Sequence, residues 1–231
     1  PATPTATDNC DIDIEITFEE VRTDGNCADN YTLTRTWTAT DNCENTDIGV
    51  QVITVQDTTA PVLVGVPIAV TVECDAVPTP ATPTATDNCD IDIEILFLEN
   101  ITPGACIDNY IITRSWTATD NCGNKTIGVQ VIIVEDTTDP VISGVPGNIT
   151  GECNALPAPA QPTATDNCDT DVTIDYTEVK MGGDCLDAYI LTRTWIATDN
   201  CGNTDIQVQV IEVEDTTGPI LSGVPADLTV E

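Results

Sequence analysis

This chain is expected to be all-β, built from tandem antiparallel β-sandwiches that repeat every 79 residues and are stapled by disulfides. Three observations support this. Hydrophobic residues make up 41% of the 231 residues, and Val, Ile and Thr, which favour strands, dominate. Apolar and polar residues alternate with a period of two, and no segment carries a helical stripe. The same cysteine-containing segment occurs three times.

The cysteines give the length of the repeat. Cys10, Cys89 and Cys168 are 79 residues apart. The same spacing holds for Cys27, Cys106 and Cys185, for Cys43, Cys122 and Cys201, and for Cys74 and Cys153. No insertion or deletion interrupts this register, so each period is one copy of a module. The expected modules are 1–56, which lacks its opening strand, then 57–135 and 136–214, followed by 215–231, the opening strand of a further module.

The incomplete first module has two explanations. In one, the sequence is a window cut from a longer tandem array. In the other, the chain forms a head-to-tail polymer in which residues 215–231 of one subunit complete the truncated module of the next by strand complementation.

The strands of one period are read from 57–135. Residues 61–74 predict one or two opening strands, which Pro67 interrupts. The proline-punctuated residues 78–87 predict an extended strand. Further strands are expected at 91–99, 110–120 and 126–136, the last two forming a hairpin around 121–124, whose Asn and Gly suit positive φ. Several short antiparallel strands in a module of this length are typical of a β-sandwich.

Alternation assigns one face of the strand near Trp37 to the core. This face carries Tyr31, Leu33, Arg35, Trp37 and Ala39. Arg35 is unusual there, because a buried guanidinium needs an acidic or aromatic partner. We therefore expect a structural arginine, paired with a carboxylate beside Trp37.

Cysteine usage indicates an oxidising, extracellular setting. The chain has eleven cysteines, no histidine and no CxxC pair, so the usual zinc patterns are absent.

Four cysteines per module allow three pairings. If the strands follow an immunoglobulin-like order, the Cys89 and Cys122 loops share one end of the sandwich, and Cys74 and Cys106 share the other. The expected pairs are Cys89 with Cys122, Cys74 with Cys106, Cys10 with Cys43, Cys168 with Cys201 and Cys153 with Cys185, leaving Cys27 unpaired.

Several segments resemble the HYR (hyalin repeat) module, an immunoglobulin-like β-sandwich. They are Glu135 to Thr150, Pro83 to Cys89 and Trp116 to Asn124, and the likeness covers the whole chain. The chain is most similar to cysteine-rich HYR-like arrays in giant secreted surface proteins of Bacteroidota, including gliding-motility adhesins. The resemblance implies an extracellular adhesive or structural role without catalysis. The two DNC cysteines and the acidity depart from the animal repeat, so animal ligands are not carried over.

Acidic loops at one end of each module suggest calcium sites. Carboxylate and amide oxygens from three loops would converge there, as Ca²⁺ requires. The candidate ligands are Asp8 and Asp41 in the first module, Asp57, Asp87, Asn88, Asp120 and Asn121 in the second, and Asp136, Asp166, Asn167, Asp199 and Asn200 in the third. The acidic linkers also resemble those of cadherins, where calcium stiffens domain junctions. The alternative is that these side chains only cap backbone N–H groups in Asx-turns.

Two kinds of glycosylation site are possible. The linkers read Asp-Thr-Thr three times, similar to an O-glycosylation acceptor pattern of Bacteroidota, which makes Thr58, Thr137 and Thr216 candidates. Sequons of the Asn-x-Thr type occur at Asn30, Asn100, Asn124 and Asn148.

Composition excludes several function classes. The net charge of −33 repels nucleic acid and anionic membranes and attracts cations, and no apolar run predicts membrane insertion. An enzyme is not expected, because there is no nucleophile–base constellation and no phosphate-binding glycine loop.

Two functions remain. One is a rigid extracellular rod, as an adhesin stalk or surface fibre, stiffened by disulfides and calcium. The other is a module that binds glycans or another surface through exposed loops.

Overall fold

A computed structural model describes residues 3–183 and 186–229. The chain divides into two compact units. One comprises Pro1–Val70, Pro78–Thr102 and Ile112–Ile132, and the other Thr71–Val77, Pro103–Ile111 and Ile133–Glu231. Each unit therefore contains one boundary between consecutive repeats. We call residues 1–56, 57–135 and 136–214 the first, second and third repeats, and 215–231 the tail.

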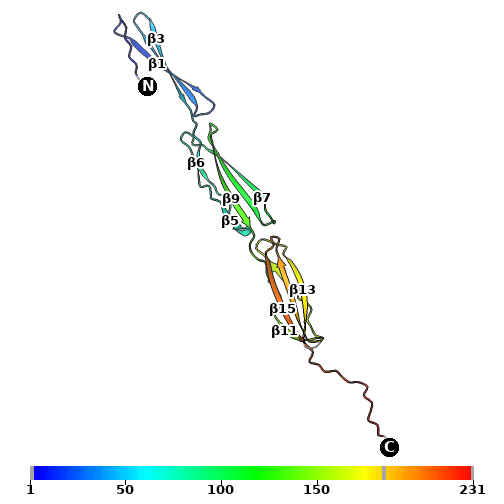
Figure 1. The fold of residues 1–231 in the computed structure, drawn as a ribbon. Coiled ribbons are helices and arrows are strands. Elements are labelled where there is room, and N and C mark those ends of the chain that lie inside the picture. The colour runs from blue at the N-terminus through cyan, green and yellow to red at the C-terminus, as the bar shows by residue number, and fades with distance from the viewer. Residues whose placement is uncertain (1–2, 184–185, 230–231) are drawn as a thin grey trace. The chain divides into compact units, whose positions relative to one another are not determined.

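Figure 1 labels β11, β13 and β15 among the strands of the third repeat. The strands are β10 (Val141–Ser143), β11 (Ile149–Glu152), β12 (Thr163–Thr165), β13 (Thr173–Gly182), β14 (Tyr189–Thr198) and β15 (Thr204–Glu214). One sheet has the order β11-β15-β14-β13, and β10 pairs with β12 in a second, smaller sheet. β11 runs parallel to β15, whereas the other pairs are antiparallel. The predicted all-β sandwich is confirmed, and this edge pair is parallel where antiparallel strands were expected.

The second repeat has the same strand order. Its elements are β4 (Val62–Val64), β5 (Val70–Glu73), a 3₁₀ turn η1 (Cys74–Ala76), β6 (Thr84–Thr86), β7 (Glu94–Pro103), β8 (Tyr110–Thr119) and β9 (Lys125–Glu135). The sheets are β5-β9-β8-β7 and β4-β6. Pro67 does separate two opening strands, and only the last residues of the proline-rich stretch form β6, because prolines cannot donate ladder hydrogen bonds.

The first repeat contains only the long strands. They are β1 (Glu15–Asp24), β2 (Tyr31–Thr40) and β3 (Thr46–Val55), in the order β1-β2-β3. Its β2–β3 register, Trp37 opposite Gly49, matches Trp195 opposite Gln207 in the third repeat. The long-strand hairpins therefore have the same register with or without the opening strands.

In each of β2, β8 and β14 an arginine and a tryptophan, two residues apart, lie on the core face, as the sequence predicted. Trp195 is 1% exposed and packs with Ile142 and Ala197. The Nε atom of Arg193, also buried, lies 2.8 Å from Glu178. In the first repeat Arg35 Nε lies 2.6 Å from Glu20, so the expected carboxylate partner is confirmed. The described part of the chain has no helix of the length and apolarity that crossing a bilayer requires.

Candidate metal centre and junction disulfides

Among the described residues, three disulfides join consecutive repeats. Cys27 pairs with Cys122 and Cys106 with Cys201, each 95 residues apart, and Cys74 pairs with Cys168 at a separation of 94. The two 95-residue bonds are equivalent by the 79-residue register. Each bond thus links a loop or turn of one repeat to a loop or turn of the next.

These bonds contradict the predicted pairings. Cys89–Cys122, Cys74–Cys106 and Cys168–Cys201 do not form, and Cys27, expected to be unpaired, is bonded. Cys10 and Cys43 also do not pair with each other. The predicted Cys153–Cys185 pair involves a residue outside the described ones. Cys10, Cys43, Cys89 and Cys153 are exposed and have no disulfide partner among the described residues.

The reason is visible at the boundary between the first two repeats. The loop between β1 and β2 docks on the end of the second repeat, where Asp29 accepts a 2.7 Å hydrogen bond from the Asn121 amide. Asn30 accepts one from the backbone N–H of Asp57. This docking brings Cys27 to 5.0 Å from Cys122, Cα to Cα. The strand order within one repeat therefore does not predict a disulfide to a cysteine of the adjacent repeat.

The boundary between the second and third repeats has the same contacts. Asp108 accepts from the Asn200 amide, and Asn109 accepts from the backbone N–H of Asp136. The Asn203 amide donates to the carbonyl of Asp136, as Asn124 does to Asp57. The repeated network shows that each described junction is a specific interface rather than a linker.

Three aspartates form a candidate metal centre within the second junction. Asp136, Asp166 and Asp199 each place a carboxylate oxygen within 4.8 Å of the others. Asp136 is 4% exposed and Asp199 6%. Oδ2 of Asp136 and Oδ2 of Asp166 are buried without a hydrogen-bond partner. Buried carboxylate oxygens normally have partners, so this arrangement fits a hard cation such as Ca²⁺.

The first junction has a related group. Asp57 and Asp87 come together with Cys89, and Oδ2 of each aspartate is again buried and unpartnered. A further group joins Glu73 to Asp136 and Cys168, whose sulfur is already in a disulfide. Among the described residues no such group forms around Asp8, which is exposed, or around Asp41, which is half-buried.

The turn and cation interpretations use different atoms of the same side chains. Oδ1 of Asp166 accepts from the N–H groups of Cys168 and Asp169 in an Asx-turn. Oδ1 of Asp136 accepts from Thr138. The turns therefore fix both carboxylates while Oδ2 stays available. Asp199 differs, because its Oδ2 accepts from the Asn203 amide.

Burial and like charges act on this centre. Desolvation raises the pKa of Asp136, with further contributions from Asp166, Asp199 and Glu73, although the Thr138 N–H opposes the shift. A bound cation would favour the ionised carboxylate and so lower the pKa of Asp136. At Asp120, burial also raises the pKa, but hydrogen bonds from Asn124, Cys122 and Gly123 outweigh it and hold the pKa below its ordinary value.

The amide N–H groups of the predicted asparagine ligands donate hydrogen bonds to other groups. Asn121 and Asn200 donate across the junctions to Asp29 and Asp108. The amides of Asn88 and Asn167 donate to the neighbouring cysteine sulfurs. The sequence did not predict the roles of Asp29 and Asp108, which lie in the loop before the strand that carries the tryptophan, or of Glu73, which ends β5.

The candidate glycosylation sites have different surroundings. Thr58 and Asn100 are exposed. Thr137 and Thr216 are exposed but donate to Glu73 and Glu152 respectively. Asn30 and Asn124 take part in the first junction. Asn148 accepts from the Val210 N–H.

Comparisons with known proteins identify a family model and several structures. The model described as "HYR-like domain with 4 cysteines" matches residues 64–134 and 141–213, more than half of the chain. No curated protein sequence matches.

Three solved structures illustrate the structural neighbours. A protocadherin gammaB7 EC3-6 cis-dimer is 14% identical, covers 87% of this chain and 67% of its own, and has a TM-score of 0.34. Mouse clustered PcdhgC3 EC1-3 is 13% identical, with coverages of 82% and 79% and a TM-score of 0.33. Drosophila N-cadherin EC1-3 is 17% identical, with coverages of 80% and 78% and a TM-score of 0.28. All three TM-scores lie below 0.5, so these likenesses do not identify a function.

Proposed function

The chain belongs to the family of HYR-like domains with four cysteines, and we propose that it is an extracellular structural array whose junctions are held by disulfides and calcium. One observation carries the proposal. Both described junctions combine disulfides that cross between repeats with buried carboxylate oxygens that lack a partner. The disulfides restrain neighbouring repeats directly, and a cation at Asp136 would also lie close to Glu73 of the preceding repeat, so the array would act as a stiff stalk or fibre in adhesion.

An extracellular location supports both parts of the proposal. Disulfides persist in oxidising compartments, and calcium is abundant enough there to fill sites of modest affinity. The net charge of −33 raises the local cation concentration further. In the chain-entropy model, a disulfide closing a loop of about 100 residues contributes about 4.7 kcal/mol.

Calcium bound at Asp136 and Asp57 would raise the free energy of unfolding. Both are nearly buried, and each keeps one oxygen in a turn and one oxygen free. A divalent cation would neutralise the clustered charge and satisfy the free oxygens. At a free concentration one hundred times its Kd, a ligand that binds only the folded state stabilises it by about 2.7 kcal/mol.

Thermal unfolding of the oxidised chain in Ca²⁺ and in excess EDTA tests this. We expect a higher Tm in Ca²⁺. The Asp57→Asn, Asp136→Asn double variant keeps the turn-accepting oxygens but loses two charges, so it should lose the response to Ca²⁺. Asp175→Asn removes an exposed charge from β13 and is the matched control. Equal Tm values in Ca²⁺ and EDTA would exclude the calcium part of the proposal.

A further inference from the structure

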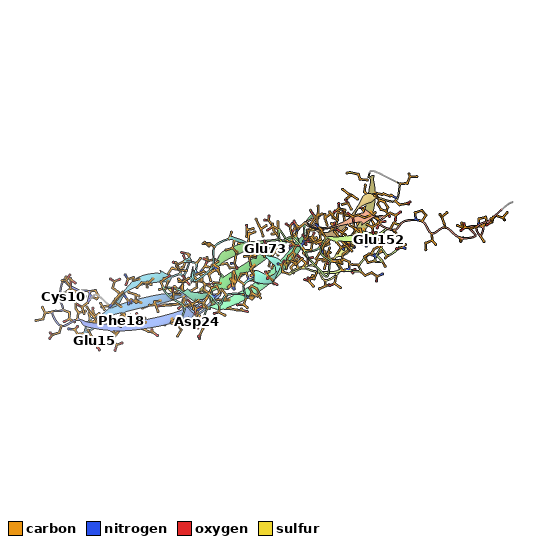
Figure 2. The ribbon with its side chains drawn as sticks, turned by 90° about the horizontal axis from the view of Figure 1, so that it is seen from below. Cys10, Glu15, Phe18, Asp24, Glu73 and Glu152 are labelled. Carbon is orange, nitrogen blue, oxygen red and sulfur yellow. A yellow bond between two sulfur atoms is a disulfide. The ribbon has the colours of Figure 1, made fainter. Side chains whose placement is uncertain are left out.

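The candidate metal centre of the second junction has a carboxylate of the preceding repeat beside it. Glu73, labelled in Figure 2, is the last residue of β5. A carboxylate oxygen of Glu73, one of Asp136 and the sulfur of Cys168 lie within 4.8 Å of one another. Asp136 also belongs to the centre that contains Asp166 and Asp199. Glu73 therefore adds a fourth carboxylate next to the three that the third repeat supplies.

The Cys74–Cys168 disulfide joins the two segments that carry these groups. Cys74 directly follows Glu73, and Cys168 lies in the turn of Asp166. The Cys168 N–H donates a 2.8 Å hydrogen bond to Asp166 Oδ1, whereas Asp166 Oδ2 is buried without a hydrogen-bond partner. One covalent bond therefore connects the strand end that carries Glu73 to the turn that fixes Asp166.

Hydrogen bonds from Thr137 also hold the Glu73 side chain. The Thr137 hydroxyl donates a 2.5 Å bond to Oε1, and the Thr137 N–H donates a 3.2 Å bond to Oε2. Both bonds are exposed, and a hydrogen bond of this kind contributes only about 1 kcal/mol. The disulfide acts more strongly, because it shortens the covalent path between Glu73 and the Asp166 turn and so raises the effective concentration of the carboxylate at the centre.

The four carboxylates carry like charges. None of the arginine ion pairs among the described residues includes one of them. Without a cation, repulsion therefore opposes the position that the disulfide gives Glu73 beside Asp136. A divalent cation between the carboxylates would replace this repulsion with attraction. Since a ligand favours the state that binds it more tightly, the closed disulfide and bound Ca²⁺ would stabilise each other.

We infer that Glu73 is a ligand of the Ca²⁺ ion proposed at the second junction, and that the Cys74–Cys168 disulfide controls whether Glu73 reaches this ion. Calcium binding is thereby coupled to the redox state of one disulfide. The closed bond tightens Ca²⁺ binding, and bound Ca²⁺ protects the bond from reduction. This inference rests on the proposed function, because it assigns a further ligand and a redox control to the same centre.

A small thiol such as glutathione supplies the electrons that open the bond. One glutathione thiolate attacks a sulfur of the Cys74–Cys168 disulfide, forms a mixed disulfide and releases the other cysteine as a thiolate. A second glutathione thiolate attacks the glutathione sulfur of the mixed disulfide and releases the second cysteine. Each released cysteine takes up a proton. Two electrons pass to the protein, and two glutathione thiols become one glutathione disulfide.

Calorimetric titration of the oxidised full chain with Ca²⁺ tests the ligand. Every variant carries Asp57→Asn, which weakens the centre of the first junction. Glu73→Gln keeps an oxygen that can accept from Thr137 but loses the charge, so it should weaken Ca²⁺ binding about tenfold. Glu212→Gln removes an exposed carboxylate from β15 and is the matched control. Its effect should stay below about twofold, because solvent and salt screen an exposed charge.

Removal of the disulfide completes a double-mutant cycle. The Cys74→Ser, Cys168→Ser variant should also bind Ca²⁺ about tenfold more weakly, and adding Glu73→Gln should change little further. The matched control is Cys106→Ser, Cys201→Ser, which removes the other bond between these repeats but leaves the one beside Glu73. In that control, Glu73→Gln should still weaken binding about tenfold.

Glutathione buffers test the reciprocal effect. The ratio of closed to open Cys74–Cys168, read by thiol alkylation and mass spectrometry, should rise about tenfold in saturating Ca²⁺ relative to EDTA. Glu73→Gln should remove most of this rise. If the oxidised Asp57→Asn chain binds no Ca²⁺, the proposed function fails and this inference fails with it. If Ca²⁺ binds but Glu73→Gln has no effect, or has the same effect with and without the Cys74–Cys168 bond, this inference alone is overturned.

Discussion

The first and third repeats share their long strands but differ in their cores. β1–β3 and β13–β15 have the same pairing register, yet Trp195 is enclosed by Ile142 whereas Trp37 lines an open groove. Local hairpins are therefore sufficient for the sheet. The core, in contrast, depends on an opening segment that is distant from the tryptophan in sequence.

Replacing the two tryptophans gives the largest expected contrast. Trp195→Ala should destabilise the third repeat by about 3 to 5 kcal/mol, because it leaves a cavity in an enclosed core. Trp37→Ala should cost about half as much, since part of its surface is already exposed. Denaturant unfolding followed by hydrogen exchange in each repeat would measure both. Equal losses would mean that the groove is covered in solution.

The arginines should show a smaller contrast of the same sign. Arg193 is buried, pairs with Glu178 and also donates to the carbonyl of Pro157. Arg193→Met should cost about 3 kcal/mol by leaving both acceptors unpartnered. Arg35→Met should cost about 1 kcal/mol, because Arg35 is more exposed than Arg193. The free energies of unfolding, compared in one buffer, decide whether enclosure sets the difference.

Acid titration should affect the two regions in opposite directions. The pKa of Asp136 is raised from 3.8, so without calcium its contribution to stability falls as pH rises from 3.8 through the folded pKa. The pKa of Asp41 is lowered by hydrogen bonds from Asn45, so its contribution is present above 3.8 and is lost as pH falls through the folded pKa.

Stability measured in EDTA across this window, for Asp136→Asn and Asp41→Asn, checks both signs. The Asp136 variant should lose a decline of stability with rising pH, and the Asp41 variant should lose an increase. The same sign in both variants would contradict the opposite pKa shifts of Asp136 and Asp41.

The hairpin between β2 and β3 offers the smallest effect. Glu44 has φ of 68°, where the other repeats have Gly123 and Gly202 at 90° and 93°. Left-handed backbone costs a side-chain-bearing residue about 1 kcal/mol, so Glu44→Gly should stabilise the first repeat by about that amount. Gly202→Glu should destabilise the third repeat similarly. Thermal unfolding of both variants measures the pair, and a stabilising Gly202→Glu would exclude backbone strain as the cause.

The sequence predicted what depends on local pattern. Alternation located the long strands, the core tryptophans and the arginine–carboxylate pairs, and turn residues located the hairpins. The sequence correctly placed Cys89 and Cys122 in loops of one repeat. It predicted that they pair with each other, whereas the partner of Cys122 is Cys27 of the preceding repeat. Pairing depends on how repeats dock, and docking depends on contacts such as Asp29 with Asn121 that no periodicity reveals. For the same reason the sequence did not predict the hydrogen bonds that the Asn121 and Asn200 amides donate across the junctions.

The crossed disulfides change what a protease can achieve. Together, the three bonds span the whole backbone from Cys27 to Cys201, and their loops overlap. A single cut anywhere between these two residues leaves both fragments covalently attached, so a nicked loop does not break the chain. At every point of this span, at least one disulfide would also carry part of a pulling force applied to the backbone. An array built in this way tolerates local damage that would sever ordinary domains joined by a simple linker.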